Sequence, residues 1–346
     1  MDKRLIMAVA GSGKTTYIVN SLSEDKRTLI VTYTNANYRN LRRKISVRFH
    51  DEWPKNTVLM TYFHFLYSFC FKPFLSDIVN AKGIVFDRDP NHYHNYRVPE
   101  FYMNHERFLY SNRLAYLIEV QQKTEDVKNR LKKYFDYFII DEVQDISGRD
   151  FNFLKLLMPT AMDMLFVGDF FQHTFDTSRD GSVNRNLFQD KTRYESYFAG
   201  NGFIIDETRL SDSWRCSKSI CEYVSSNLGI RISSNRSPDD NTQIYFIEDV
   251  EEIKRILYDS SIIKLHYKNG AKFGLSHKNW GETKGEDNYS DICVLLNPTT
   301  MQKYRFGRLN ELSASTKNKL YVALTRAHGN VFLIEEKVAE QLIDSI

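Results

Sequence analysis

The 346-residue sequence has only four cysteines, and they form no pattern that would bind zinc or build a disulfide framework. They are scattered and include no CxxC pair, at positions Cys70, Cys216, Cys221 and Cys293. We therefore expect these cysteines to be reduced and structural, as is usual inside a cell.

Long hydrophobic runs are also missing. The longest aromatic and aliphatic stretch, 62–75, is interrupted by histidine, serine, lysine and proline, so it cannot span a bilayer. Only six apolar residues lie between Arg4 and Gly11, too few for the core of a secretory signal. We expect a cytoplasmic protein with no membrane partner.

A strong charge of one sign is absent as well. The formal net charge is +3, which falls short of a histone-like, purely charge-driven binder. Hydrophobic residues make up 42% of the chain and charged residues 26%, values of a globular protein rather than a disordered one. Aromatic residues reach 14%, which fits base stacking as well as ordinary core packing.

Short apolar runs alternate with amphipathic helical stretches along most of the chain, which indicates α/β units with parallel sheets. The expected strands are 5–10, 28–33, 57–61, 135–140, 164–168, 202–205, 243–247, 262–265, 291–296 and 330–334. Expected helices in the second half are 218–227, 250–258 and 315–325. The length and this repeat predict two lobes, 1–205 and 206–346.

The alternation lapses between residues 74 and 133, where proline, asparagine, histidine and tyrosine are followed by a helical run near 106–120. This change predicts a small subdomain inserted into the first lobe.

The strongest local motif is AVAGSGKT at 8–15, which lies between an expected strand and an expected helix, the context of a P-loop. Small residues allow backbone N–H groups to surround phosphates, Lys14 adds a positive charge, and the Thr15 hydroxyl can coordinate Mg²⁺. The alternative is a plain glycine-rich turn. The predicted ATP-binding residues are Ala10, Gly11, Ser12, Gly13, Lys14, Thr15 and Thr16.

An acidic segment, DEVQD at 141–145, follows the expected strand 135–140 directly. Carboxylates at the carboxyl edge of a parallel sheet lie where ligands bind. We expect Asp141 to hold Mg²⁺ through water and Glu142 to act as the base that orients and deprotonates the attacking water. A solvated acidic turn is the alternative for an isolated acidic pair.

Segment 141–145 resembles motif II of the UvrD/Rep-like superfamily 1 DNA helicases. Further segments resemble the other motifs of that family in order, namely 31–35, 61–65, 167–172, 213–215, 283–287 and 320–327. The resemblance implies an α/β fold of two RecA-like P-loop NTPase lobes, with ATP and Mg²⁺ bound between them. It also implies 3′-to-5′ movement along a single strand.

The resemblance assigns roles to residues of both lobes. Gln172 would sense the γ-phosphate, while Arg215 and Arg326 would act as arginine fingers on the transferred phosphoryl group. Trp214 would stack on adenine. Further nucleotide contacts would come from motif V, at Gly285, Glu286 and Asp287.

Strand binding would use Tyr33, Asn35, His64 and Phe175, whose rings and amide are able to stack on bases and contact phosphates. Core packing is the alternative for such aromatics. The basic run 39–44 could contact the phosphate backbone or form a solvated face.

Only 67 residues separate Arg215 from Thr283, a shorter interval than the large helical subdomain that full relatives carry there. We therefore predict a compact ATP hydrolase that moves along single-stranded DNA, or RNA, more readily than it unwinds duplex. Repair and antiviral defence are both compatible roles. The alternatives are a DNA-sensing ATPase subunit that activates a nuclease or other effector partner, and a nucleotide-dependent switch.

Overall fold

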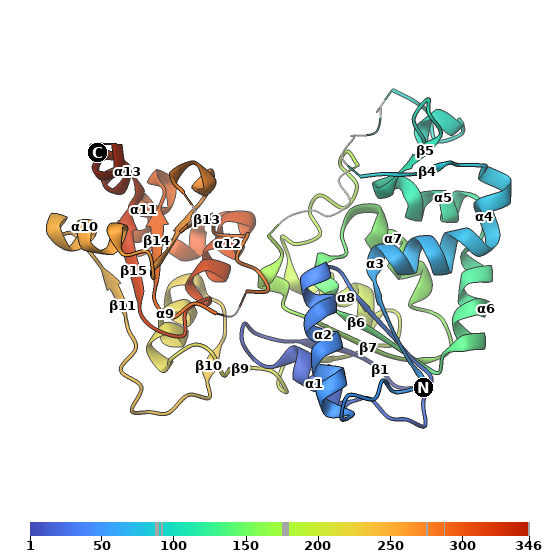
Figure 1. The fold of residues 1–346 in the computed structure, drawn as a ribbon, viewed down its shortest axis with the longest axis horizontal. Coiled ribbons are helices and arrows are strands. Elements are labelled where there is room, and N and C mark those ends of the chain that lie inside the picture. The colour runs from blue at the N-terminus through green and yellow to red at the C-terminus, as the bar shows by residue number, and fades with distance from the viewer. Residues whose placement is uncertain (87–89, 91–92, 175–179, 275, 287, 345–346) are drawn as a thin grey trace. The chain divides into compact units, whose positions relative to one another are not determined.

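The computed structural model describes residues 1–86, 90, 93–174, 180–274, 276–286 and 288–344 (Figure 1). The chain divides into two compact units, each built on its own parallel sheet. The first unit comprises Met1–Met7, Lys14–Gly168 and Phe175–Asp206, and the second comprises Ala8–Gly13, Asp169–Thr174 and Glu207–Ile346. The predicted α/β class with parallel sheets is confirmed. No helix within the described ranges is long and apolar enough to cross a membrane.

The first unit has a six-stranded sheet in the order β3-β2-β6-β7-β1-β8, and every pairing in it is parallel. Its strands are β1 (Lys3–Met7), β2 (Thr28–Thr32), β3 (Thr57–Thr61), β6 (Tyr137–Asp141), β7 (Asp163–Gly168) and β8 (Ile204–Asp206). Strand β2 is buried along its whole length, as expected for a strand that is covered on both faces. The first strand runs over Lys3–Met7 rather than over the expected 5–10, so it begins and ends earlier, and residues 8–10 belong to the loop after β1.

Most helical segments of the first unit lie outside the expected insertion, and α4 runs into its beginning. They are α1 (Lys14–Asn20), α2 (Asn35–Arg48), α3 (Tyr62–His64), the π-helical η1 (Phe65–Phe71), α4 (Lys72–Val79), η4 (Val143–Asp145), α7 (Gly148–Leu157) and α8 (Lys191–Ala199). The side chain of Thr34 accepts a hydrogen bond from the N–H of Asn37 and so begins α2. This cap fixes the start of the helix immediately after β2.

The region between 74 and 133 contains β4 (Gly83–Val85), η2 (Pro99–Phe101), β5 (Phe108–Tyr110), η3 (Ser111–Arg113), α5 (Leu114–Val120) and α6 (Thr124–Tyr134). The prediction of a helical run over 106–120 is wrong in its first half. Residues Phe108–Tyr110 pair in parallel with Gly83–Val85, and the α-helix begins only at Leu114. Aromatic residues pack well on a pleated strand, and this pairing overrides the helical pattern.

A buried ion pair fastens this region to the rest of the first unit. Arg113 and Asp180 lie 2.8 Å apart, with side chains only 1% and 3% exposed. Arg149 of α7 also pairs with Asp180, and the Arg113 guanidinium lies 3.6 Å from the ring centre of Phe101. Burial alone would raise the pKa of the Asp180 carboxyl, but the hydrogen bonds and charges of the two arginines together hold this pKa below its usual range.

The second unit has a five-stranded parallel sheet in the order β11-β15-β14-β12-β13. Its strands are β11 (Ile244–Phe246), β12 (Ile263–His266), β13 (His277–Asn279), β14 (Ile292–Leu296) and β15 (Val331–Glu335), with a separate pair β9 (Asp212–Ser213) and β10 (Ser233–Ser234). Its helical segments are η5 (Phe170–Gln172), α9 (Lys218–Leu228), α10 (Val250–Tyr258), η6 (Gly270–Phe273), α11 (Pro298–Arg305), η7 (Leu309–Glu311), α12 (Ala314–Leu324) and α13 (Glu336–Asp344).

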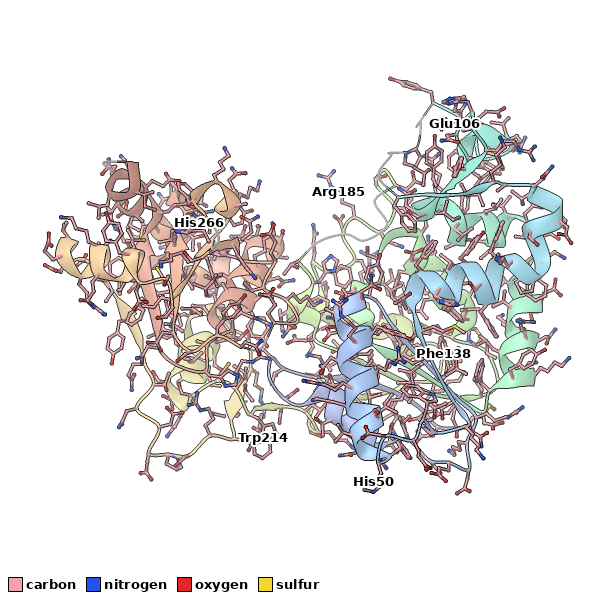
Figure 2. All side chains as sticks on the ribbon, in the orientation of Figure 1. His50, Glu106, Phe138, Arg185, Trp214 and His266 are labelled. Carbon is pink, nitrogen blue, oxygen red and sulfur yellow. The ribbon has the colours of Figure 1, made fainter. Side chains whose placement is uncertain are left out.

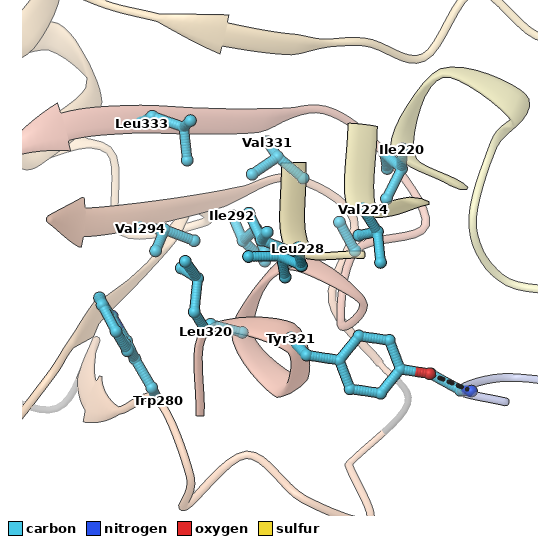
Figure 3. Close-up of a cluster of buried hydrophobic side chains, with 14 of the residues drawn as sticks. Ile220, Val224, Leu228, Trp280, Ile292, Val294, Leu320, Tyr321, Val331 and Leu333 are labelled. Carbon is cyan, nitrogen blue, oxygen red and sulfur yellow. Dashed lines mark hydrogen bonds between the residues drawn. The ribbon is translucent and has the colours of Figure 1, made fainter. Parts of the chain in front are cut away.

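The core of the second unit lies between its sheet and helices α9 and α12 (Figure 3). Val294 and Leu333 of the sheet face Leu320 of α12, and Trp280 closes one side. The Trp280 indole is fully buried and donates a hydrogen bond of 3.0 Å to the carbonyl of Leu265. This packing fixes α12 against the sheet.

Replacing Arg113 by alanine tests the buried ion pair. We expect Arg113→Ala to lower the free energy of unfolding of the first unit by about 3 kcal/mol or more, because it leaves the Asp180 carboxylate buried with one cation fewer. Urea unfolding of the purified protein would measure the loss. Lys128→Ala, which removes the partly exposed pair with Glu125 on α6, is the control and should cost less than about 1 kcal/mol. Equal effects of the two substitutions would contradict the prediction.

Candidate functional site

The glycine-containing loop 8–13 runs from β1 to α1, as the P-loop motif predicts. Gly11 and Gly13 have φ angles of +71° and +87°, in the left-handed region that favours glycine. Lys14, Thr15 and Thr16 form the first turn of α1. The loop 8–13 groups with the second unit and Lys14 with the first.

In the first unit, Lys14 meets the acidic residues at the end of β6. Its Nζ atom lies 3.5 Å from a carboxylate oxygen of Glu142, and both side chains are almost fully buried. Glu142 has a φ of 56°, an unusual value for a residue other than glycine, and its second oxygen accepts a hydrogen bond from the amide of Gln144. Lys14 and Gln144 thus fix the carboxylate of the predicted base.

Asp141 lies next to this pair in an unusually unfavourable position for a carboxylate. One oxygen accepts a hydrogen bond of 3.3 Å from Thr32, while the other is buried without a partner among the described residues. Burial, together with the negative charge of Glu142, raises the Asp141 pKa to about 7. An orphaned, buried carboxylate oxygen at the carboxyl edge of a sheet fits a cation.

The described residues contain no group of three or more His, Cys, Asp or Glu side chains that could hold a metal by themselves. Mg²⁺ is usually bound through one or two carboxylates with phosphates and water, so the single buried aspartate of the first unit, next to Lys14 and Glu142, fits this metal. Thr15, the other predicted ligand, lies partly exposed in the first turn of α1.

In the second unit, the loop 8–13 packs closely against residues 213–215. Trp214 donates a backbone hydrogen bond of 2.9 Å to the carbonyl of Gly11. A Cβ atom on Gly11 would lie 2.7 Å from Cβ of Arg215 and 2.7 Å from Oγ of Ser213, so this approach requires glycine. The Trp214 side chain is exposed, to 66% of its area (Figure 2). Its ring lies 4.0 Å from where a Cβ on Gly13 would stand.

The structure brings the two predicted arginine fingers together at the end of α12. The Arg215 guanidinium donates a hydrogen bond of 3.0 Å to the carbonyl of Thr325, the residue before Arg326. Arg326 donates to the carbonyls of Val322 at 3.2 Å and Thr283 at 3.4 Å. Both arginines are buried, so their orientations are defined by the fold.

The other predicted nucleotide-binding residues differ in their burial and in the contacts that they already make. Gln172 is buried in η5, and Gly285 has a φ of +84°. The Glu286 carboxylate forms an ion pair of 2.8 Å with Lys278 and accepts a hydrogen bond from Tyr289. It is therefore already engaged by these two side chains. Asp287 lies outside the described residues.

The remaining residues of the P-loop motif differ in whether their polar groups already have hydrogen-bond partners. The Ala10 N–H donates to the hydroxyl of Tyr321, so this amide is already satisfied. The Ser12 hydroxyl is buried and has no hydrogen-bond partner within the described part of the chain. Thr16 is exposed and accepts a hydrogen bond of 3.1 Å from Lys44.

Three of the predicted strand-binding residues lie at one edge of the first sheet, because they follow the adjacent parallel strands β2 and β3. Tyr33 stacks on Tyr62 with ring centres 5.9 Å apart, whereas Asn35 and His64 are exposed. Phe175, the fourth, lies outside the described residues.

Sequence reasoning assigned no role to two residues that the structure places in contact with the site. Gln144 orients Glu142, and Tyr321 binds the Ala10 amide. Both lie inside segments that resemble helicase motifs, 141–145 and 320–327, and a polar residue within such a segment is the signal that points to them.

The sheet of the first unit, the loop before Lys14 and the acidic pair after β6 define a P-loop protein of the α/β class. A family model described as an AAA domain matches residues 2–177, just over half of the chain. The chain belongs to this AAA domain family. Among curated proteins, none matches the chain. The predicted P-loop domain is thus confirmed, while the finer resemblance to UvrD/Rep-like helicases stays a prediction.

Two solved structures are similar to the chain. The PRRSV helicase aligns with a TM-score of 0.48 and 14% identity, over 96% of this chain and 52% of its own. Arterivirus nonstructural protein 10, a helicase solved in complex with DNA, aligns with a TM-score of 0.48 and 13% identity, over 98% of this chain and 63% of its own. The chain therefore spans less than two thirds of either protein. Similarity of this size carries no functional conclusion.

Replacing Asp141 by asparagine tests the cost of the buried carboxyl. The folded pKa of about 7 lies above the ordinary value of 3.8, so stabilisation by the bound proton is complete below about pH 4 and is lost as the pH rises through 7. We expect Asp141→Asn to remove this loss and to stabilise the nucleotide-free protein at about pH 8, by at most about 4 kcal/mol. Unfolding measured from about pH 5 to about pH 8 in chelator would check this, and parallel profiles would contradict it.

Proposed function

We propose that the chain is an ATP-driven motor of the UvrD/Rep-like kind that moves along single-stranded DNA, with 3′-to-5′ polarity. One observation carries the hydrolytic part of the proposal. The Glu142 carboxylate is held by both Lys14 and Gln144 beside an aspartate whose second oxygen lacks a partner among the described residues. A base held in this way is suited to hydrolysis rather than to binding alone.

The chemistry follows from these positions. Lys14 would attract the terminal phosphates, and Glu142, oriented by Gln144, would accept a proton from the attacking water. Asp141 and Thr15 are the residues that would hold Mg²⁺. When bound, Mg²⁺ would offset the charge that develops on the transferred phosphoryl group.

The second unit supports the same reaction. The proposal requires Arg215 and Arg326 to stabilise charge on the same phosphoryl group, with Gln172 reporting its presence. Their buried, hydrogen-bonded guanidiniums need little reorganisation to do so. Trp214, exposed beside Gly13, offers a ring for adenine.

Helix α2 supports a nucleic-acid partner. Its sequence contains no acidic residue, and Arg39, Arg42 and Arg43 are exposed on it without an ion pair among the described residues. Such a face attracts a polyanion. The helix follows Tyr33 and Asn35, so phosphate contacts and base contacts would be adjacent.

The small number of elements between Arg215 and Thr283 in the second unit favours translocation over strong unwinding. The described residues between Arg215 and Thr283 form α9, β10, β11, α10, β12, η6 and β13 and include no large helical subdomain. A protein partner such as a nuclease or effector would supply duplex opening or cleavage. RNA in place of DNA remains an outcome of the test below.

Steady-state ATP hydrolysis tests the proposed function. We expect stimulation by single-stranded DNA, and we expect Glu142→Gln to bind ATP but to hydrolyse it at least about 100-fold more slowly, because the base is lost. Single-stranded RNA, blunt duplex and the Lys14→Ala variant are the controls. Full hydrolysis by Glu142→Gln would exclude the proposed base. ATP binding without stimulation by any strand would favour a partner-dependent subunit or a nucleotide switch.

Charge removal on α2 tests the strand contact. We expect the triple substitution Arg39→Gln, Arg42→Gln and Arg43→Gln to weaken single-strand binding and to lower the slope of log affinity against log salt by about two, as expected for three lost phosphate contacts. Fluorescence anisotropy over a salt series would measure it. The matched control replaces Lys128, Lys132 and Lys133 of α6 by glutamine. An equal change in both triple variants would indicate a non-specific effect of net charge.

A further inference from the structure

Tyr321 of α12 connects two segments of the second unit that the proposed function uses. Its side chain is fully buried in the core, and its hydroxyl extends from that core toward the loop 8–13 (Figure 3). The hydroxyl oxygen lies 2.9 Å from the backbone nitrogen of Ala10 and 3.0 Å from Oδ2 of Asp169. One phenol therefore touches the P-loop and the segment that leads to Gln172.

The donors and acceptors at this hydroxyl have only one consistent arrangement. The Ala10 N–H can only donate, so the tyrosine oxygen accepts from it and its O–H donates a hydrogen bond to the Asp169 carboxylate. The other Asp169 oxygen accepts from the N–H of Phe171 at 3.1 Å. Burial raises the Tyr321 pKa well above its usual range, so the hydroxyl remains a donor at physiological pH.

A second contact from the same helix holds the other end of this segment. The Asn318 amide, one turn before Tyr321, donates a buried hydrogen bond of 3.1 Å to the carbonyl of His173. Gln172 lies between the two points of attachment, and its N–H donates to the carbonyl of Asp169. Helix α12 therefore holds the short segment 169–174 near both of its ends, at Asp169 and at His173.

We propose that Tyr321 is a positioning residue that links occupation of the P-loop to the position of Gln172. This inference rests on the proposed function. A phosphate that attracts the amides of the loop changes the geometry of the bond from Ala10, and the rigid phenol transfers the change to Asp169. Because the phenol packs in the core, it has little freedom to absorb the displacement itself.

A matched pair of variants separates this role from simple core packing. Tyr321→Phe keeps the ring and removes only the hydroxyl. Tyr223→Phe removes a hydroxyl from α9, next to the same core, where the oxygen is buried but has no hydrogen-bond partner in the described ranges. A purely structural role predicts similar behaviour of the two variants, whereas positioning predicts an effect of Tyr321→Phe alone.

The experiment is hydrogen exchange of the full chain, read by mass spectrometry over 169–174, with and without the imido analogue of ATP and Mg²⁺. We expect the analogue to slow exchange of this segment by about tenfold in the parent protein and in Tyr223→Phe, and to have no such effect in Tyr321→Phe. Equal protection in Tyr321→Phe would overturn the proposal. Absence of protection in the parent protein would overturn it as well.

Strand-stimulated hydrolysis, measured in parallel, distinguishes the two hypotheses. Nucleotide-dependent protection without any strand stimulation would reject the proposed motor while retaining the link through Tyr321. If both are present, Tyr321→Phe should lower the stimulation about tenfold, and Asp169→Asn combined with it should add little, because the two residues act through one bond. Full additivity of the two substitutions would show that they act separately and would contradict the proposed route.

Discussion

Two carboxylates buried side by side at the end of β6 are the constraint on which the site of the first unit depends. Asp141 and Glu142 repel each other in a region of low polarity, and Lys14 and Gln144 hold only the second of them. The free-energy cost of burying two adjacent carboxylates therefore falls on Asp141. Its pKa rises, and its second oxygen lacks a partner among the described residues. A cation at this oxygen would relieve both effects, which is the reason that the proposed function assigns Mg²⁺ to Asp141.

The loop 8–13 meets a different constraint, which is steric. Gly11 allows Ser213 and Arg215 to approach so closely that a single added methyl group would collide with both. Trp214 and Tyr321 then satisfy polar groups of the loop backbone, at Gly11 and Ala10. Backbone groups of the loop are thus divided between those used by the protein itself and those left for a ligand. Under the proposed function, this division would give the loop its shape before a phosphate binds.

Much of this could be predicted from sequence because it depends on local patterns. Apolar runs located strands such as β2 and β14, and helical periodicity gave the bounds of α10 (Val250–Tyr258) correctly. Strand β13 (His277–Asn279) was missed because it is polar and is held by pairing with β12. The motif residues at carboxyl edges were predictable from topology, but the contacts of Gln144 depend on packing distant in sequence. Its amide lies against Gly168 at the end of β7, a proximity that no spacing along the chain reveals.

Buried arginines show why residue type and burial alone do not define a role. Arg113 and Arg326 are both almost fully buried, and the contacts that define their orientations involve different groups. Arg113 pairs with the Asp180 carboxylate, which offsets the charge of the guanidinium. This ion pair holds the inserted region to the rest of the first unit. Carbonyl oxygens of Val322 and Thr283 orient Arg326, and a carbonyl directs a guanidinium without carrying a net charge. We therefore place Arg113 in the framework, whereas the place of Arg326 in the reaction stays part of the proposed function and rests on its motif at the end of α12.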